Sequence, residues 1–320
     1  MVSVENSLPK IITIVGPTAS GKTDLAAKIA KKYDGEIISA DSRQIYRGMD
    51  IGTAKPPRDK NPHYSLLNTH YYSEGIPHHL INIKNPNQSY TVAQYKKDAI
   101  RVIKKILADG KLPILVGGTG LYIKAVVENL IIPEVKPNPR LRKKLEQKLQ
   151  KNGLESLYRE LVERDPEAAY IVDRHNPRRV IRALEITLAT NMPFSVQRKQ
   201  GQKLFDALKI GLNPPKEKLK SKIEKRVDLM LRAGLLKETK QLMKKYGPNL
   251  PAFDAIGYRE IINYLQGKIS LPETVDLIKK NTWHYAKRQL TWFKKDKEIK
   301  WIGKPEEAGK LLRVFLEKGG

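Results

Sequence analysis

The sequence predicts an α/β fold in which helices flank a parallel sheet and an all-helical insertion interrupts the alternation. Short apolar, β-branched runs alternate with segments of helical spacing over roughly the first 130 residues, which is typical of a parallel sheet with helices on both faces. Residues 138–190 then show helical spacing alone, and an apolar run near residue 208 returns the chain to the sheet.

The expected elements follow in order along the chain. Apolar runs predict strands at 11–15, 36–40, 79–83, 112–116, 208–212 and 299–302. Helical spacing predicts helices at 22–33, 91–108, 120–129, 140–151, 154–164 and 177–189, and over most of 216–296. We therefore expect a core domain of residues 1–132 with 205–320 and a helical insertion domain of 133–204. The polar segment 56–77 is expected to be an ordered surface loop or a small excursion.

A phosphate-binding loop joins the first strand to the first helix. Its eight residues match the pattern G-x-x-x-x-G-K-[ST] and are Gly16, Pro17, Thr18, Ala19, Ser20, Gly21, Lys22 and Thr23. Backbone N–H groups of such a loop and of the following helix N-terminus cradle phosphates. Lys22 supplies a positive charge, and the Thr23 hydroxyl can hold Mg²⁺. The motif indicates a P-loop NTPase-like core that binds a polyphosphate, and it leaves the reaction open.

Composition and charge narrow the function classes. The 320 residues include no cysteine, which excludes disulfides, thiolate metal sites and a cysteine nucleophile. The chain has no apolar run long enough for a membrane span, and its first residues lack the pattern of a signal peptide, so we expect a cytoplasmic protein. The net charge of +26 favours a polyanionic partner such as nucleic acid. A solvated, lysine-rich surface is the alternative interpretation.

Asp41 lies at the carboxyl end of the second expected strand, beside the phosphate loop. Its position suits a general base acting on an acceptor near the phosphates. It also suits a Mg²⁺ ligand, although it follows Thr23 unusually early, or a carboxylate that only shapes a turn. The next residues add polar groups suited to hydrogen bonding with a planar heterocycle, namely Ser42, Arg43 and Gln44.

Further candidates lie at another strand end and in two helices. The segment Gly117-Gly118-Thr119-Gly120 follows a strand and implies close backbone approach to a ligand or a helix.

In the insertion, Arg178 and Arg182 share one helix face with Arg179 adjacent. Arginines there suit phosphates and base edges, but a solvated basic face, with Glu185 paired to Arg182, is equally compatible. In the helix at 281–295, aromatic residues interleave with Lys and Arg, which suits RNA contact or core packing of the rings.

Several of these segments together resemble the tRNA dimethylallyltransferase family. The resemblance runs in order along nearly the whole chain and rests on GPTASGKT, ISADSRQIYRGMDIGTAKP, HHLI, LVGGTGLYI, NPRRVIRALEI, AIGYREI and AKRQLTWF. It implies transfer of a dimethylallyl group from its diphosphate to the exocyclic amine of the adenosine immediately 3′ of a tRNA anticodon. The phosphate loop then binds the diphosphate leaving group with Mg²⁺, and no ATP is hydrolysed.

The resemblance also implies a role for individual residues. Asp41 corresponds to the base that accepts the amine proton, Lys22 and Thr23 to ligands of the diphosphate and Mg²⁺, and Arg226 to an arginine that reaches the diphosphate. The implied tRNA contacts are Asp41, Ser42, Arg43, Gln44, Thr119, Arg142, Arg178, Arg179 and Arg182. The implied partners are the tRNA anticodon stem-loop and dimethylallyl diphosphate, and we expect a monomer with no membrane association.

Three other functions fit parts of the pattern. These are a small-molecule kinase with the same loop, a prenyltransferase acting on free adenine nucleotide, and a tRNA-binding protein without activity. The helical insertion and the net charge favour a macromolecular acceptor, and the intact Lys22, Thr23 and Asp41 argue for catalysis. One departure from the family pattern is the sequence Asp173-Arg174-His175-Asn176 before the paired arginines, which affects only the local turn.

Overall fold

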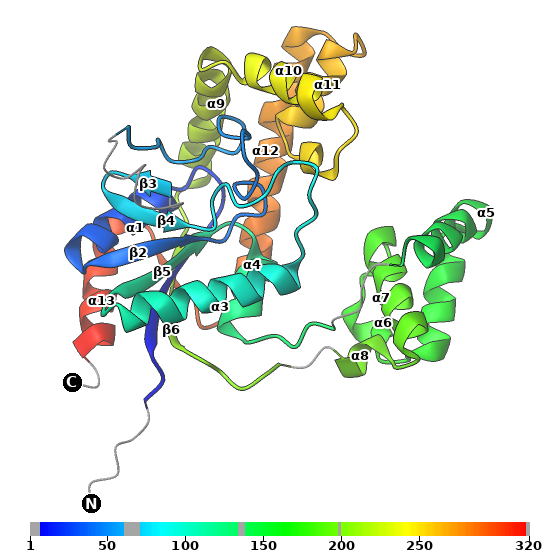
Figure 1. Ribbon diagram of the computed structural model, residues 1–320, viewed down its shortest axis with the longest axis horizontal. Helices are drawn as coiled ribbons and strands as arrows, with labels where there is room; N and C mark the ends of the chain where they lie inside the picture. Colours follow the sequence, from blue (N-terminus) through cyan, green and yellow to red (C-terminus); the bar gives the residue numbers. More distant parts are fainter. Residues whose placement is uncertain (1–6, 61–70, 134–137, 198–199, 318–320) are drawn as a thin grey trace, which may run out of the picture. The chain divides into compact units, whose positions relative to one another are not determined.

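The computed structural model describes residues 7–60, 71–133, 138–197 and 200–317, which divide into two compact units (Figure 1). The core unit joins residues 1–127 to 204–320, and the insertion unit is 128–203. The insertion unit thus begins at residue 128 rather than at the expected 133. Residues 61–70 of the polar segment, and 134–137 and 198–199 of the expected insertion, lie outside the described residues.

A mostly parallel sheet forms the centre of the core unit, which confirms the predicted fold class. The described residues form seven strands in the order β3-β4-β2-β5-β1-β6-β7. Among these seven described strands, only β3 runs antiparallel to its neighbour, β4. Their bounds are β1 (Lys10–Val15), β2 (Gly35–Ser39), β3 (Tyr71–Ser73), β4 (Ile76–His79), β5 (Leu112–Gly117), β6 (Asp206–Leu212) and β7 (Lys300–Ile302).

The strand expected at 79–83 was misplaced. It lies earlier, as β4, and pairs with the unanticipated β3. The strand ends at His79 because Leu80 and Asn82 adopt left-handed φ angles of 63° and 57°, which an extended strand does not allow.

Helices cover both faces of the sheet. On one face, Ile11, Val15 and Leu115 pack against α3 (Val92–Ala108) and α4 (Gly120–Val127). On the other face, Ile12, Ile14 and their neighbours pack against α1 (Lys22–Lys32) and α13 (Ala308–Glu317), which follows the short η2 (Pro305–Glu307). Side chains of successive strand residues point to opposite faces, so the continuous apolar run of β1 supplies both cores.

A helical layer lies over one end of the sheet, beside the loops that leave β1 and β2 (Figure 1). It has its own apolar core, in which Ile45, Tyr46 and Met49 from the segment after β2 take part. This layer therefore fixes the chain that follows Asp41. Its elements are α9 (Lys216–Arg232), α10 (Leu235–Tyr246), η1 (Pro251–Asp254), α11 (Tyr258–Leu265) and α12 (Leu271–Phe293).

The described part of the insertion unit is helical around a separate apolar core. Leu157, Leu161, Val180 and Leu184 are at its centre. The two helices expected at 140–151 and 154–164 are one element, kinked at Gly153, whose φ is 77°. The elements are α5 (Pro139–Arg164), α6 (Ala168–Ile171), α7 (Pro177–Thr190) and α8 (Phe194–Gln197).

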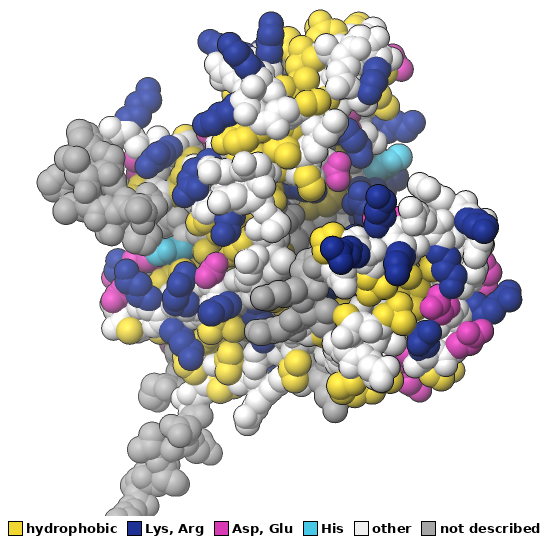
Figure 2. All heavy atoms as spheres, turned by 45° about the vertical axis from the view of Figure 1, so that its right-hand side comes forward, with side chains coloured by type: hydrophobic (Ala, Val, Ile, Leu, Met, Phe, Trp, Pro, Cys, Tyr) yellow, Lys and Arg dark blue, Asp and Glu magenta, His cyan; other side chains and the backbone are white. Residues whose placement is uncertain are grey.

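Basic side chains are spread over the surface of each unit. On the face in Figure 2, Lys and Arg side chains occur throughout, and Asp and Glu side chains are fewer. No helix in the described part of the chain is both long enough and apolar enough to cross a membrane.

Candidate active site

The phosphate loop leaves β1 and wraps the N-terminus of α1. Gly16 has a φ of 146°, and a Cβ there would lie 2.7 Å from the Leu212 carbonyl oxygen. Gly21 is left-handed, with a φ of 92°, and its carbonyl accepts from the Leu25 N–H at 3.1 Å. Both glycines of the motif are thus required by backbone geometry. The loop closes around Pro17, whose carbonyl accepts from the Ser20 N–H and from Lys22 Nζ.

Burial and nearby charges shift the pKa of Lys22. Burial lowers the pKa of Lys22 to about 7, the nearby Arg226 charge adds to this effect, and Asp41 opposes it. A cation held in this state gains its full charge when a phosphate approaches, because an opposite charge stabilises the protonated form. Thr23 is exposed at the start of α1, and the Ser20 hydroxyl is buried without a hydrogen-bond partner among the described residues. The loop therefore offers polar groups that an anion would satisfy.

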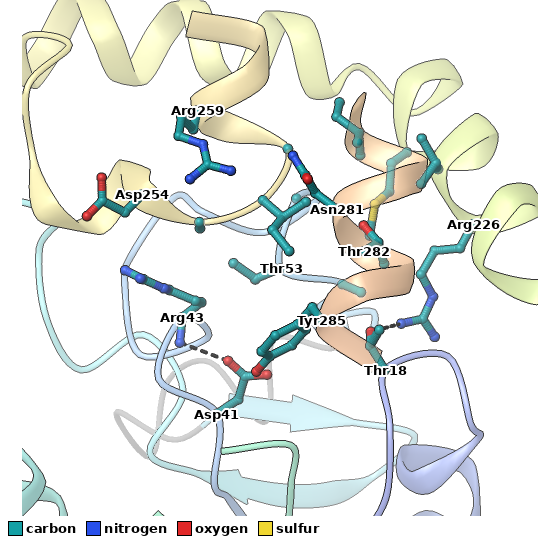
Figure 3. A pocket seen from close by; sticks show the side chains of 18 of the residues that line it. Thr18, Asp41, Arg43, Thr53, Arg226, Asp254, Arg259, Asn281, Thr282 and Tyr285 are labelled. Carbon is teal, nitrogen blue, oxygen red and sulfur yellow. Dashed lines mark hydrogen bonds between the residues drawn. The ribbon is translucent and has the colours of Figure 1, made fainter. Parts of the chain in front are cut away.

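Asp41 lies just beyond β2, in a turn that its own carboxylate stabilises. Its Oδ1 accepts from the Arg43 N–H at 2.8 Å and from the Gln44 N–H at 3.3 Å. Asp41 can therefore both stabilise the turn and act as a general base. Both hydrogen bonds go to Oδ1, and Oδ2 remains able to accept a proton. In Figure 3 the carboxylate lies beside the Tyr285 ring.

A cavity of about 510 Å³ in the core unit joins these groups. Thr18 of the phosphate loop, Asp41 and Arg226 all line it (Figure 3). Arg226 Nη1 donates to Thr18 Oγ1 at 3.4 Å, so α9 brings this arginine to the loop. The remaining lining residues are Ser42, Arg43, Gly52, Thr53, Ala54, Val227, Met230, Asp254, Ala255, Ile256, Gly257, Arg259, Ile278, Asn281, Thr282, Tyr285 and Arg288.

Like Asp41, the four other candidate RNA contacts in the core unit have partners within the protein. The Gln44 amide accepts from Ser39 Oγ at 2.9 Å and donates to the carbonyls of Thr53 and Ala54. Thr119 Oγ1 accepts from the Ser42 N–H at 3.1 Å. Arg43 donates to the carbonyls of Pro251 and Ala252. These bonds fix the walls of the cavity, and Ser42 and Arg43 also line it.

The candidate arginines of the insertion unit divide into two pairs. Arg142 Nη2 and Arg182 Nη1 lie 2.6 and 3.0 Å from the carboxylate of Glu185, whose side chain is fully buried. The neighbouring arginines and the Asn138 N–H lower the pKa of Glu185 against the opposing effect of burial. Arg178 and Arg179 lie at the start of α7, where both residues are exposed. The sequence had left the pairing of Arg182 with Glu185 open, and the structure shows it.

Sequence reasoning did not single out several residues of the cavity, and it gave Tyr285 only as one of the aromatic residues of the 281–295 helix. Arg259, Asn281 and Tyr285 line the cavity from α11 and α12. Arg259 Nη2 and Asn281 Nδ2 both donate to the buried Glu260 carboxylate. The segment AIGYREI was part of the family resemblance, but its charges did not differ from those of an ordinary helix. The two tryptophans of the 281–295 helix follow the packing alternative, because Trp283 packs near Ala19 and Trp292 packs in the core between α3, α4 and the sheet. The Tyr285 ring lines the cavity instead.

Comparison with known proteins identifies the family. A family model described as IPP transferase matches residues 44–296, and one described as isopentenyl transferase matches residues 9–66. The tRNA dimethylallyltransferase of Acetivibrio thermocellus is 45% identical over 303 residues, 93% of this chain and 93% of the relative. That of Carboxydothermus hydrogenoformans is 44% identical and covers 97% of each.

Solved structures agree with the sequence matches. The tRNA isopentenylpyrophosphate transferase of Bacillus halodurans is 38% identical, covers 97% of both chains and superposes with a TM-score of 0.68. A eukaryotic dimethylallyltransferase solved while acting on tRNA is 30% identical, with a TM-score of 0.69, over 89% of this chain and 70% of its own. With the phosphate loop, Asp41 and Arg226 around one cavity, these matches show that the chain belongs to the tRNA dimethylallyltransferase family.

Proposed function

We propose that this protein transfers a dimethylallyl group from dimethylallyl diphosphate to the exocyclic amine of the adenosine 3′-adjacent to a tRNA anticodon, and releases diphosphate. One observation carries the proposal beyond family membership. The phosphate loop, through Thr18, shares a single cavity with a cation, Arg226, and with a carboxylate, Asp41. This arrangement supports a diphosphate leaving group near Thr18 and Arg226 and a proton acceptor at Asp41 within the same cavity.

The diphosphate end of the cavity stabilises the leaving group. The allylic C–O bond breaks only if the charge that develops on diphosphate is neutralised. In our proposal the loop from Gly16 to Thr23 binds the diphosphate through its N–H groups, and Lys22 and Arg226 supply positive charge.

The donor set also fits a divalent metal, which we propose to be Mg²⁺. The described residues contain no cluster of three or more His, Asp or Glu side chains that could hold a metal by themselves. Mg²⁺ commonly binds through one or two protein groups, with substrate phosphates and water as the other ligands, and the exposed Thr23 hydroxyl can serve as the protein group. When bound there, Mg²⁺ would neutralise charge on the diphosphate.

Asp41 is the general base in this proposal. An adenine amine is a poor nucleophile, so its proton must leave as the new C–N bond forms. The N–H groups of Arg43 and Gln44 hold Oδ1, which orients the carboxylate toward the cavity. Oδ2 then accepts the amine proton, a role worth about 10²–10⁴ in rate for a positioned base.

The acceptor is a macromolecule in our proposal. The target base must leave its stack to reach a cavity of this kind, and the exposed Arg178 and Arg179 of the insertion unit are the tRNA contacts that its structure favours. Ser42 and Arg43 would contact the tRNA near the reacting base. We expect the protein to act as a monomer in the cytoplasm.

The test is mass spectrometry of tRNA nucleosides after incubation with purified protein, dimethylallyl diphosphate and Mg²⁺ in the absence of ATP. We expect one prenylated adenosine per tRNA and one diphosphate released, with Asp41→Asn slowed about 10²–10⁴-fold at unchanged tRNA affinity. In a parallel reaction to which ATP is added, stoichiometric ATP consumption would indicate a kinase instead. Prenylation of free adenine nucleotide as rapid as that of tRNA would indicate the other alternative.

A further inference from the structure

The side chain of Gln289 connects two loops of the candidate active site. It extends from α12, is 6% exposed, and has both ends of its amide occupied. Oε1 accepts from the Thr18 N–H of the phosphate loop at 2.8 Å, and Nε2 donates to the Gly118 carbonyl at 2.9 Å. An amide is suited to this position because it donates from its nitrogen and accepts at its oxygen.

Each of these two bonds leads to a group of the proposed reaction. On one side, Thr18 Oγ1 also contacts Arg226. On the other side, Gly118 precedes Thr119, whose N–H donates to the Ala40 carbonyl and whose Oγ1 accepts from the Ser42 N–H. The two residues that flank Asp41 are therefore held by the loop that Gln289 holds.

The glycine at 118 is required by the Gln289 side chain. A Cβ on Gly118 would lie 2.1 Å from Gln289 Nε2, and the next two nearest atoms belong to the same amide. The overlap is with the end of a flexible side chain, so an alanine can be accommodated only if the amide leaves its position. The backbone at 118 is not left-handed, so alanine adds no conformational strain there.

We propose that Gln289 is a positioning residue for prenyl transfer, which fixes the phosphate loop relative to the Asp41 turn. The inference rests on the proposed function for its effect on rate. Gln289 does not line the cavity, so it acts through Thr18 and Gly118 rather than on the substrate. Because a shift of about 1 Å between reacting groups can cost roughly 10²-fold in rate, loss of this link should slow the chemical step.

A double-substitution cycle tests the proposal. Single-turnover rates at saturating tRNA and dimethylallyl diphosphate are measured for wild type, Gln289→Ala, Gly118→Ala and the double variant, with melting temperatures alongside. Each single variant should be slowed about 100-fold. In the Gln289→Ala background the Cβ at 118 meets no amide, so Gly118→Ala should change the rate further by less than about threefold. Thr291→Ala, on the exposed side of the same helix, is the matched control and should retain the wild-type rate.

A second arm measures the affinity for inorganic diphosphate by calorimetry in the same variants and in the isosteric Gln289→Glu. Gln289→Glu can still accept from Thr18 but no longer donates to Gly118 when ionised, so it should be slowed even where its melting temperature is unchanged. Variants that melt earlier but keep the wild-type rate per folded molecule, or effects of the two substitutions that simply multiply, would overturn the proposal. If wild type yields no prenylated tRNA but diphosphate binding shows the same non-additive cycle, the proposed function fails, and what stands is that Gln289 fixes the phosphate loop.

Discussion

Substitution of Arg142 should destabilise the insertion unit, although the family resemblance implied a tRNA contact. Arg142→Ala removes one of three groups that hold the fully buried carboxylate of Glu185, the others being Arg182 and the Asn138 N–H. A hydrogen bond to a charged group is worth about 1.5–3 kcal/mol, and breaking a buried pair altogether costs about 3–5 kcal/mol.

Three features of the site lower that cost. Arg182 stays in place, and the side chain of Arg142 is 42% exposed, so water already screens its charge. In addition, Arg142 Nε is buried without an acceptor among the described residues, and the substitution removes that unpaired donor. We therefore expect a loss of about 2 kcal/mol, which corresponds to roughly 10 °C for a unit of this size if it melts by itself.

The assay combines three measurements: hydrogen exchange of the α7 amides, a melting curve and the tRNA dissociation constant per folded molecule. Arg178→Ala is the matched control, because Arg178 is exposed at the start of the same helix. It should keep α7 protected and should weaken tRNA binding without affecting diphosphate. If Arg142→Ala leaves the exchange and the melting temperature unchanged and weakens tRNA binding as much as Arg178→Ala does, the structural role assigned to Arg142 is wrong.

Three further predictions concern charge. Burial and Arg226 lower the pKa of Lys22 to about 7, and a bound diphosphate should raise it. Calorimetry at pH 8 in buffers of different ionisation enthalpy should therefore detect proton uptake when diphosphate binds. Equal binding heats in all buffers would contradict this prediction. The dependence of log affinity for tRNA on log salt should become shallower by about 0.7–0.9 in Arg178→Ala, and an unchanged slope would place Arg178 away from phosphates. A hydrogen bond from His79, with a smaller effect of Lys111, lowers the pKa of Glu36 from 4.5 to about 2. The stabilisation that the ionised Glu36 carboxylate gives the folded protein is therefore complete above about pH 4.5 and is lost as the pH falls through 2. The melting temperatures of wild type and Glu36→Gln should converge as the pH falls over that range, and they should not converge at higher pH.

The sequence by itself determined those parts of the site whose geometry is local. The phosphate loop could be identified because eight consecutive residues specify its backbone, including the left-handed Gly21. Asp41 could be placed because a polar residue at the end of a buried parallel strand lies at the edge where such sheets bind ligands. Most strands and helices followed from periodicity. The exceptions include β3, which was not anticipated, the strand that left-handed residues after His79 ended early, and the two expected helices that form the kinked α5.

Only the tertiary structure shows which distant side chains reach the phosphate loop and which arginines contact a buried carboxylate. Arg226 and Gln289 reach the phosphate loop from helices more than 200 residues away in sequence, and neither differs locally from an ordinary charged or polar residue on a helix. Arg142 and Arg178 are alike in sequence, and only the fold shows that Arg142 contacts the buried carboxylate of Glu185. Periodicity and motifs report on neighbours along the chain, whereas the role of these side chains depends on what the fold places opposite them.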